Sequence, residues 1–438
     1  DGIGETMRIW AILRLEGGVD PARLSRGIEA AQETHSVMRT ILRRRWLRTA
    51  REIQDDLRGG VLTVQDLTGL QDADCEGHIC QWMNEPMDIR KGFPFRVLLL
   101  KMNEAESWLV FAFHHSAADG LRVALFIRHV IDSYNGAVSD DSESCQEIRS
   151  SRKGDELLAF ANSQRPRVQC YYLKMILSLF YRFVIAALLP PTRVFHDKSG
   201  NSKELDFHLK AIGGWELEEI QSRAGSVGVE LHDILLSACH RAVEKWNSMH
   251  GKPSKRIRIM VPVNVSPKGY RHVVSNQVSW ISPSTTPVDR AAPTELLRRV
   301  RSDDIRAIKG RMACSLIYFF YFCSRLPLPL MRAGCRFLMI TRTYVDSIVF
   351  TNAGLIWPKA GSEEPVVTHI GTSKIAFIVG LAPVVSPMGL SFAACIYNKN
   401  LAICLTYRPA LFSREKARRF LDLYVEEVKN YPLAPDET

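Results

Sequence analysis

The sequence predicts a mixed α/β protein made of two folded units. Its 438 residues are too many for one ordinary hydrophobic core but suit two units of about 200 residues each. Strand-like and helix-like patterns occur in both halves, without the short-period repeat of a solenoid or propeller. With 46% hydrophobic and 24% charged residues, the composition is typical of a compact globular protein.

The first half begins with a strand followed by a helix. Residues 8–14 (RIWAILR) are predicted to form the strand, and Asp20-Pro21 marks the start of a helix with apolar residues at helical spacing. Residues 108–113 are apolar, as in a buried strand, and a second helix runs from Leu121 to Gly136. A strand-to-helix turn is therefore expected between 113 and 121.

Residues 191–204 (PTRVFHDKSGNSKE) are the predicted linker, because they are rich in turn-forming residues and lack periodicity. The expected units are residues 1–190 and 205–438. In the second unit we expect helices at 233–250, 294–309 and 413–429, and strands at 256–265, 275–281, 345–351, 389–397 and 401–407.

Residues 171–190 (YYLKMILSLFYRFVIAALLP) are strongly apolar. A spanning helix needs about 20 predominantly apolar residues, and Lys174 and Arg182 make insertion costly by a few kcal/mol each. We therefore expect an amphipathic or interfacial helix that contacts a membrane peripherally. Three alternatives stay open for this segment and for residues 313–323: a lipid tunnel, a membrane contact, or simple core and domain-interface helices.

The charge balance favours an anionic partner. The chain has 57 Lys and Arg against 47 Asp and Glu, a net charge of +10, which suits a coenzyme phosphate, an acidic carrier protein or an anionic membrane. Nucleic-acid binding is not expected, because no zinc-finger, helix-turn-helix or aromatic-studded basic pattern is present.

The ten cysteines form no paired C-x-x-C sets, and the first residues lack the pattern of a secretion signal, so a cytoplasmic location is expected.

One motif stands out as a site for chemistry: His114-His115-Ser116-Ala117-Ala118-Asp119-Gly120. Its four fixed positions would arise by chance in roughly one such chain in a thousand. Because an apolar strand delivers the histidines onto a turn, fixed structure supports an imidazole whose pKa lies naturally near neutrality. His115 is therefore the predicted general base of an acyl transfer that needs no enzyme nucleophile.

Asp119 is predicted to have a structural role, since a carboxylate just before a helix can fix the turn through the helix's first amides. The same letters also allow two ordinary histidines with a helix-capping Asp, or a two-histidine metal site. No further ligand at metal-binding spacing follows, so no metal is expected. The chain also lacks the G-x-S-x-G, phosphate-loop, dinucleotide and H-E-x-x-H signatures.

This motif resembles the H-H-x-x-x-D-G loop of the condensation-domain and CoA-dependent acyltransferase superfamily. Residues 34–40 (THSVMRT) resemble its early His-x-x-Leu-Arg-Thr element. Several later segments resemble the bacterial wax ester synthase/diacylglycerol acyltransferase branch: Pro262-Val263-Asn264, residues 275–279 (SNQVS), Thr351-Asn352, residues 388–392 (MGLSF) and Tyr397-Asn398. These matches run in order over roughly residues 8–430.

The resemblance implies two chloramphenicol-acetyltransferase-like subdomains in a V-shaped pseudo-dimer, with His115 at the floor of a tunnel between them. It places His114 and Gly120 in the same catalytic loop and implies an ion pair between Arg39 and Asp119. Asn276 and Ser279 would supply substrate or oxyanion contacts, with strand-end hydrogen bonding as the alternative.

Three departures from the related branches bear on the substrate. Leu121-Arg122 follows the motif where peptide-forming domains often have Trp-Ser, which disfavours the peptide-forming branch. Gln277 replaces the usual arginine of the wax ester branch, and Tyr407-Arg408-Pro409 stands where that branch commonly has an acidic residue, which disfavours its long-chain alcohol or diacylglycerol substrates.

The leading functional hypothesis is an acyltransferase that moves an acyl group from acyl-CoA or an acyl carrier protein to a hydroxyl or amine. The acceptor would be a small molecule or a lipid, and no bound cofactor is expected. The first alternative is a stand-alone, amide-forming condensation domain of the nonribosomal-peptide type. The second is a catalytically silent docking module.

Overall fold

The fold comes from a computed structural model of the chain. It describes residues 7–45, 48–55, 60–69, 74–136, 188–265, 273–309, 326–341, 346–359, 365–385 and 388–432, together with Leu177 and Val184.

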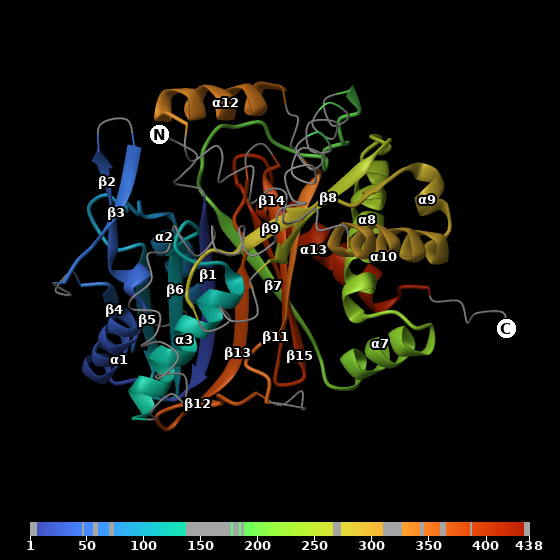
Figure 1. Cartoon of the computed structure of the whole chain (residues 1–438). Helices are drawn as coiled ribbons and strands as arrows, with labels where there is room; N and C mark the ends of the chain where they lie inside the picture. The colour runs from blue at the N-terminus through green and yellow to red at the C-terminus, as the bar shows by residue number, and fades with distance from the viewer. Residues whose placement is uncertain are drawn as a thin grey trace.

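The first half is built on a six-stranded, mostly antiparallel sheet (Figure 1). Its strand order is β12-β13-β1-β6-β5-β4, and only β4 and β5 pair in parallel. Consecutive side chains of the central strands β1 and β6 are apolar and buried, so both faces of the sheet are covered there. The strands are β1 (Arg8–Glu16), β4 (Leu62–Asp66), β5 (Phe95–Asn103), β6 (Glu106–His114), β12 (His369–Ile370) and β13 (Ser373–Leu381).

Helices α1 (Pro21–Thr34) and α3 (Gly120–Asn135) lie against each other in this half. Gly27 of α1 permits the close contact, because a Cβ at that position would lie 2.9 Å from the carbonyl oxygen of Val130 in α3. α3 ends as expected at Gly136, whose φ of +74° suits a glycine C-cap. The remaining elements are the 3₁₀ helix Ser36–Arg39, α2 (Cys75–Asn84) and the hairpin of β2 (Thr40–Arg45) and β3 (Arg48–Ile53).

The second half contains a seven-stranded sheet of order β10-β8-β11-β14-β15-β7, with β9 paired to β8. Figure 1 shows α8, α10 and α13 on one side of this sheet. The strands are β7 (Asp206–Gly213), β8 (Ile257–Asn264), β9 (Val278–Ile281), β10 (Ser284–Thr285), β11 (Ile348–Leu355), β14 (Leu390–Tyr397) and β15 (Asn400–Tyr407). The helices are α7 (Trp215–Ser226), α8 (Leu231–Met249), α9 (Pro287–Ala291), α10 (Pro293–Lys309), α12 (Leu328–Thr341) and α13 (Arg414–Lys429).

The second half contributes two strands to the first sheet. β12 and β13 come from the second half of the sequence, yet β13 pairs with β1 in an antiparallel register that joins Trp10 to Leu381. The first sheet therefore takes strands from both sides of the expected linker at 191–204. That linker packs on the second half: Val194 is buried, and the Thr192 amide donates to the Arg256 carbonyl oxygen at 2.7 Å.

Most of the predicted elements in the described residues are confirmed, with ends shifted by a few residues. The sequence did not predict the 3₁₀ helix Ser36–Arg39 or the elements β2, β3, β4, β5, β7, β10, β12, β13, α2, α9 and α12. Residues 313–323 and most of 171–190 lie outside the described residues. Among the helices that are described, none is long and apolar enough to cross a membrane.

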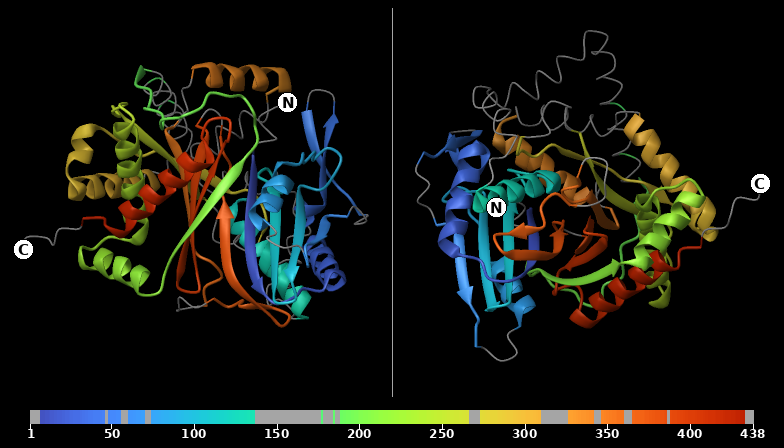
Figure 2. Two further views of the ribbon diagram at one scale, coloured as in Figure 1. Left: turned by 180° about the vertical axis from the view of Figure 1, so that it is seen from behind. Right: turned by 90° about the horizontal axis from the view of Figure 1, so that it is seen from below.

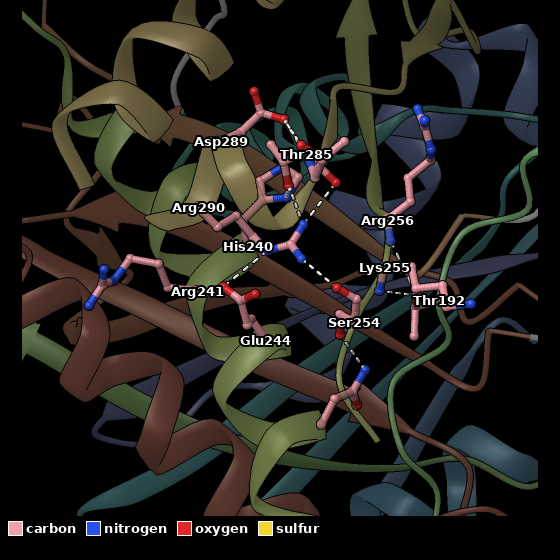
Figure 3. Close-up of polar contacts among 12 residues, drawn as sticks. Thr192, His240, Arg241, Glu244, Ser254, Lys255, Arg256, Thr285, Asp289 and Arg290 are labelled. Atoms are coloured by element: carbon pink, nitrogen blue, oxygen red, sulfur yellow. Dashed lines mark hydrogen bonds and ion pairs between the residues drawn. The ribbon is translucent and has the colours of Figure 1, made fainter. Parts of the chain in front are cut away.

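A buried polar network holds α8, α9 and the strands beside them together (Figure 3). The Arg290 guanidinium donates to the carbonyl oxygens of Thr285 and Ser254 at 2.8 and 2.7 Å and lies 3.0 Å from the Glu244 carboxylate. The Thr285 hydroxyl also contacts Nδ1 of His240 at 2.9 Å. Burial, together with the Arg290 charge, lowers the pKa of His240 to about 3.

His240→Gln is predicted to reduce the sensitivity of the fold to acid. The unfolded chain binds a proton at His240 below pH 6.5, whereas the folded chain binds it only near pH 3, so stability is lost as the pH falls between these values. Between pH 7 and pH 5, the free energy of unfolding should fall by about 2 kcal/mol less in the variant than in the wild type. Urea unfolding at the two pH values measures this difference. The exposed His369→Gln is the control; equal losses in wild type and His240→Gln would contradict the prediction.

Candidate active site

The histidine motif lies where the sequence placed it, on the turn between β6 and α3. β6 ends at His114, and α3 begins at Gly120. The His115 amide donates to the Met7 carbonyl oxygen at 2.8 Å, and the Ala117 amide donates to the His114 carbonyl oxygen at 2.9 Å. The central strands of the first sheet therefore fix the backbone of the loop.

The second half of the chain contributes Asn276 to the His115 side chain. The Asn276 amide nitrogen lies 2.6 Å from the His115 carbonyl oxygen and 3.2 Å from His115 Nδ1. Its Oδ1 accepts from the Val278 amide at 3.3 Å, which directs the NH₂ group toward the histidine. An NH₂ group can donate to Nδ1 only when that nitrogen carries no proton, so this contact favours the neutral ring.

Burial acts in the same direction on His115. It lowers the pKa of the ring, while the backbone of His115, the Asp119 carboxylate and the backbone of Ala118 oppose the shift. The ring remains partly exposed. A neutral, partly exposed imidazole at pH 7 is the form that can accept a proton.

Asp119 connects the loop to both halves of the chain. It is the N-cap of α3, where one carboxylate oxygen accepts from the Arg122 amide at 3.2 Å. The other oxygen accepts from the Gln277 amide of the second half at 2.8 Å, and the Asp119 amide faces the Ser275 carbonyl oxygen at 3.4 Å. Burial raises the pKa of Asp119, opposed by these two amides and by the Arg122 charge. These contacts support the prediction that Asp119 has a structural role, which is to fix the turn before α3.

The expected ion pair between Arg39 and Asp119 is wrong. Arg39 ends a 3₁₀ helix, and its guanidinium lies 4.0 Å from Asp55; among the described residues it makes no ion pair with Asp119. The arginine that reaches the motif is Arg51 of β3, which donates to the Ser116 carbonyl oxygen. Sequence reasoning missed Arg51, because the β2–β3 hairpin that carries it has no distinctive pattern.

The remaining predicted site residues differ in their surroundings. His114 is buried, and its Nδ1 lies 2.8 Å from the Ser116 hydroxyl, which fits a supporting position. Gly120 is exposed, and an added Cβ would meet no atom within 4 Å. Ser279 lies in β9 with its hydroxyl buried and without a hydrogen-bond partner. Of the two predicted contacts from the second half, only Asn276 therefore touches His115.

A family model described as the condensation domain matches residues 7–251. This match covers more than half of the chain and includes the histidine motif. The protein therefore belongs to the condensation-domain family, as the resemblance indicated.

Two curated relatives are large synthetases. Tyrocidine synthase 3 of Brevibacillus parabrevis is 23% identical over 249 residues, and a plipastatin synthase component of Bacillus subtilis (strain 168) is 24% identical over 133 residues. These matches cover 56% and 30% of this chain, but each spans only 4% of the relative's length.

Solved structures match the whole fold. The first condensation domain of the calcium-dependent antibiotic synthetase matches with a TM-score of 0.65 at 14% identity, over 99% of this chain and 94% of that one. The SgcC5 protein from Streptomyces globisporus matches with a TM-score of 0.63 at 17% identity, with the same coverage. The expected α/β fold of two chloramphenicol-acetyltransferase-like halves is confirmed, whereas the tunnel between them stays an expectation.

Asp119→Ala is predicted to destabilise the protein more than Asp20→Ala. Both carboxylates cap a helix, and Asp20 of α1 accepts from the Arg23 amide at 2.8 Å. Loss of that cap alone costs about 1 kcal/mol. Asp119→Ala also leaves the Gln277 amide without its partner, so its total cost should be about 3 kcal/mol in urea unfolding. Equal costs would show that the contact between the halves contributes nothing.

Proposed function

We propose that this protein transfers an acyl group from a thioester, carried by CoA or by an acyl carrier protein, to a hydroxyl or amine acceptor. One observation carries the proposal: His115 lies where the two halves meet, with the Asn276 amide nitrogen 3.2 Å from its Nδ1, and burial lowers the pKa of the ring, which favours the neutral form. Family membership supports acyl transfer in general. The choice of donor and acceptor belongs to the proposal.

In this reaction His115 is the general base. In the neutral ring that Asn276 favours, the proton lies on Nε2 and the unprotonated nitrogen is Nδ1. The acceptor hydroxyl or amine therefore displaces the Asn276 contact and gives its proton to Nδ1 as it attacks the thioester carbonyl carbon. The tetrahedral intermediate then collapses, its carbon–sulfur bond breaks, and the imidazolium returns the proton to the departing thiolate. The products are an ester or amide and a free thiol, so the proton and electron pairs balance without an acyl-enzyme.

The loop around His115 has supporting tasks in this proposal. Asp119 and His114 fix the backbone that presents the ring, and Asn276 is a positioning residue that keeps it neutral. The open space at Gly120 would let the thioester approach, and Ser279 would serve as an oxyanion contact only after its strand shifts.

Two features support the proposed partners. One structural match, the starter condensation domain of rhizomide synthetase, was solved in complex with C8-CoA. The net charge of +10 suits the phosphates of CoA or an acidic carrier. The resemblance of residues 275–279 to the wax ester branch supports a hydroxyl or lipid acceptor, in the cytoplasm or at a membrane contacted through residues 171–190. Gln277 in place of that branch's arginine, and Tyr407-Arg408-Pro409 in place of an acidic residue, count against its long-chain alcohol or diacylglycerol substrates.

An amide-forming, stand-alone condensation domain is the second candidate. The curated relatives are named as synthases of plipastatin and tyrocidine, and one structural match is a condensation domain of the calcium-dependent antibiotic synthetase, which supports this reaction to the same degree as the first. The two candidates share His115 as base and differ in whether a carrier-bound amine or a free acceptor attacks. Thiol release, measured with a panel of acyl donors and of free and carrier-bound acceptors, distinguishes the two reactions.

His115→Ala is predicted to lower acceptor-dependent thiol release by about a hundredfold or more, because the acceptor loses its general base. The assay measures free thiol from acyl-CoA and acyl-carrier donors with pooled alcohols and amines, for the wild type and the variant. His369→Ala, a change at an exposed histidine of β12, should retain full activity. Equal release from wild type and His115→Ala would contradict the mechanism, and release from neither would favour a docking module.

The pH profile of kcat/KM is predicted to have its acid limb below pH 6.5. Activity needs neutral His115, and burial lowers the pKa of this ring below 6.5, so the rate should rise with pH through that lowered value and then level off. Steady-state rates between pH 4.5 and about 8 test this. A rate that is still rising in proportion to hydroxide above pH 7 would contradict a base with a lowered pKa.

A further inference from the structure

Arg51 brings a positive charge from the β2–β3 hairpin to the histidine motif. The hairpin stands at the outer edge of the first half in Figure 1 and in both views of Figure 2. The Arg51 guanidinium donates to the carbonyl oxygen of Ser116, the residue that follows His115. Because neighbouring Cα atoms are about 3.8 Å apart, a group bound by Arg51 lies close to the proposed general base.

The loop fixes the carbonyl group that Arg51 contacts. The amide and the hydroxyl of Ser116 both lie against Nδ1 of His114, at 3.2 and 2.8 Å. The Ser116 amide can only donate, so this nitrogen of His114 is an acceptor. With these two groups engaged by His114, the third polar group of Ser116, its carbonyl oxygen, is presented to Arg51.

No carboxylate of the described residues neutralises the charge of Arg51. Two other arginines of this region each have one: Arg39 lies 4.0 Å from Asp55, and Arg43 of β2 lies 3.4 Å from Glu52. The printed partner of Arg51 is instead a neutral carbonyl oxygen. A guanidinium has five N–H donors, so the charge and further donors remain for a ligand.

Arg51 and His115 both lie in a recess of the protein. Arg51 is exposed to solvent by surface area, yet desolvation by the surrounding protein lowers the pKa of its guanidinium. His115 is partly exposed, and burial lowers the pKa of its ring. Side chains that water reaches although protein surrounds them lie in a hollow, which is where a small ligand can contact both.

We propose that Arg51 binds a carboxylate of the acceptor, so that the acceptor is a free amino acid or hydroxy acid. Its amine or hydroxyl lies at His115, and its carboxylate lies a few bonds away at the guanidinium. The assignment rests on the proposed function, because it takes His115 as the base that receives the proton of the acceptor. It narrows the acceptor from any alcohol or amine to one that carries a negative charge.

The position of Arg51 favours a carboxylate over a phosphate. The phosphates of CoA are separated from the thioester by the whole pantetheine arm with its two amide units, and the phosphate of a carrier protein's prosthetic group is separated in the same way. Arg51 contacts the residue next to His115 and is therefore too close to the reacting carbon for these phosphates. The two oxygens of a carboxylate also match the planar fork of a guanidinium.

The carboxylate belongs to the acceptor and not to the acyl group. His115 contacts the acceptor directly, since it removes the proton from the attacking atom, whereas the acyl chain begins one bond further away. A free acceptor follows from the same chemistry. An aminoacyl group on a carrier protein has no free carboxylate, because that carbon forms the thioester.

Holding the loop does not by itself require an arginine. A neutral N–H group can donate to the Ser116 carbonyl oxygen as well. A guanidinium that is partly desolvated and lacks a carboxylate partner is a costly choice for that task alone. The charge is therefore the feature that a test has to isolate.

Ligand-observed NMR tests the assignment without an acyl donor. Saturation is transferred from the wild-type protein to pools of the common amino acids and of hydroxy acids such as lactate, hydroxybenzoates and hydroxylated fatty acids. Matching pools contain their primary amides. The wild type should bind at least one acid more tightly than its amide by about tenfold or more, because a hydrogen bond between charged groups is stronger than one to a neutral group.

Arg51→Gln removes the charge and keeps an N–H group for the Ser116 carbonyl oxygen. It should weaken binding of the preferred acid by about tenfold or more and leave binding of the amide unchanged. The matched control is Arg43→Gln, which removes a charge from the other strand of the same hairpin and should retain the preference for the acid. If Arg51→Gln only disturbed the loop, the acid and the amide would be weakened alike.

Four results would overturn the assignment. They are a wild type that binds no acid of the pools, equal binding of acids and amides by the wild type, an unchanged preference for the acid in Arg51→Gln, and binding only of diacids without a nucleophile, such as succinate, which would place the carboxylate on the acyl group. Failure of the proposed function gives a different result: acids bind through Arg51, but no donor releases thiol. Thiol release with uncharged acceptors alone would contradict the carboxylate assignment and leave acyl transfer standing.

Discussion

The contact between the histidine loop and residues 275–277 is the constraint on which the site depends. Asp119 accepts one amide from its own helix and one from the other half of the chain, and Asn276 donates back to His115. The two Asp119 bonds are buried or partly buried, so losing a partner there costs more than at an exposed position. In the proposed reaction, the general base His115 is therefore positioned only when the two halves are joined.

The pairing of β13 with β1 ties the two halves together at this junction. β13 leaves the second half, completes the first sheet beside β1, and returns to β14, where the Ser391 hydroxyl donates to the Ala382 carbonyl oxygen. Trp357 of the second half adds an indole hydrogen bond of 2.8 Å to the Ala124 carbonyl oxygen in α3. Because α3 is capped by Asp119, movement between the halves would be transmitted to the loop.

Local pattern was enough to predict β1, β6, α3 and the turn that bears the motif, because each is specified by neighbouring residues. β13 was missed, since its partner β1 lies at the far end of the chain and pairing over that distance has no local signature. The expected ion pair between Arg39 and Asp119 was wrong for a related reason. The tertiary packing of the 3₁₀ helix and the β2–β3 hairpin decides which groups the long Arg39 side chain can reach. Asn276 came from the resemblance, whereas the Gln277 amide could not be predicted, because every residue except proline carries one.

The proposed reaction depends on a neutral His115, which burial and Asn276 favour. NMR titration of the His115 ring, assigned with His115→Gln, measures this before any substrate is known. The account predicts a pKa below 6.5 in the wild type and a rise toward 6.5 in Asn276→Ala, which removes the donor that favours the neutral ring. A wild-type pKa above 6.5, or a pKa unchanged by Asn276→Ala, would contradict it.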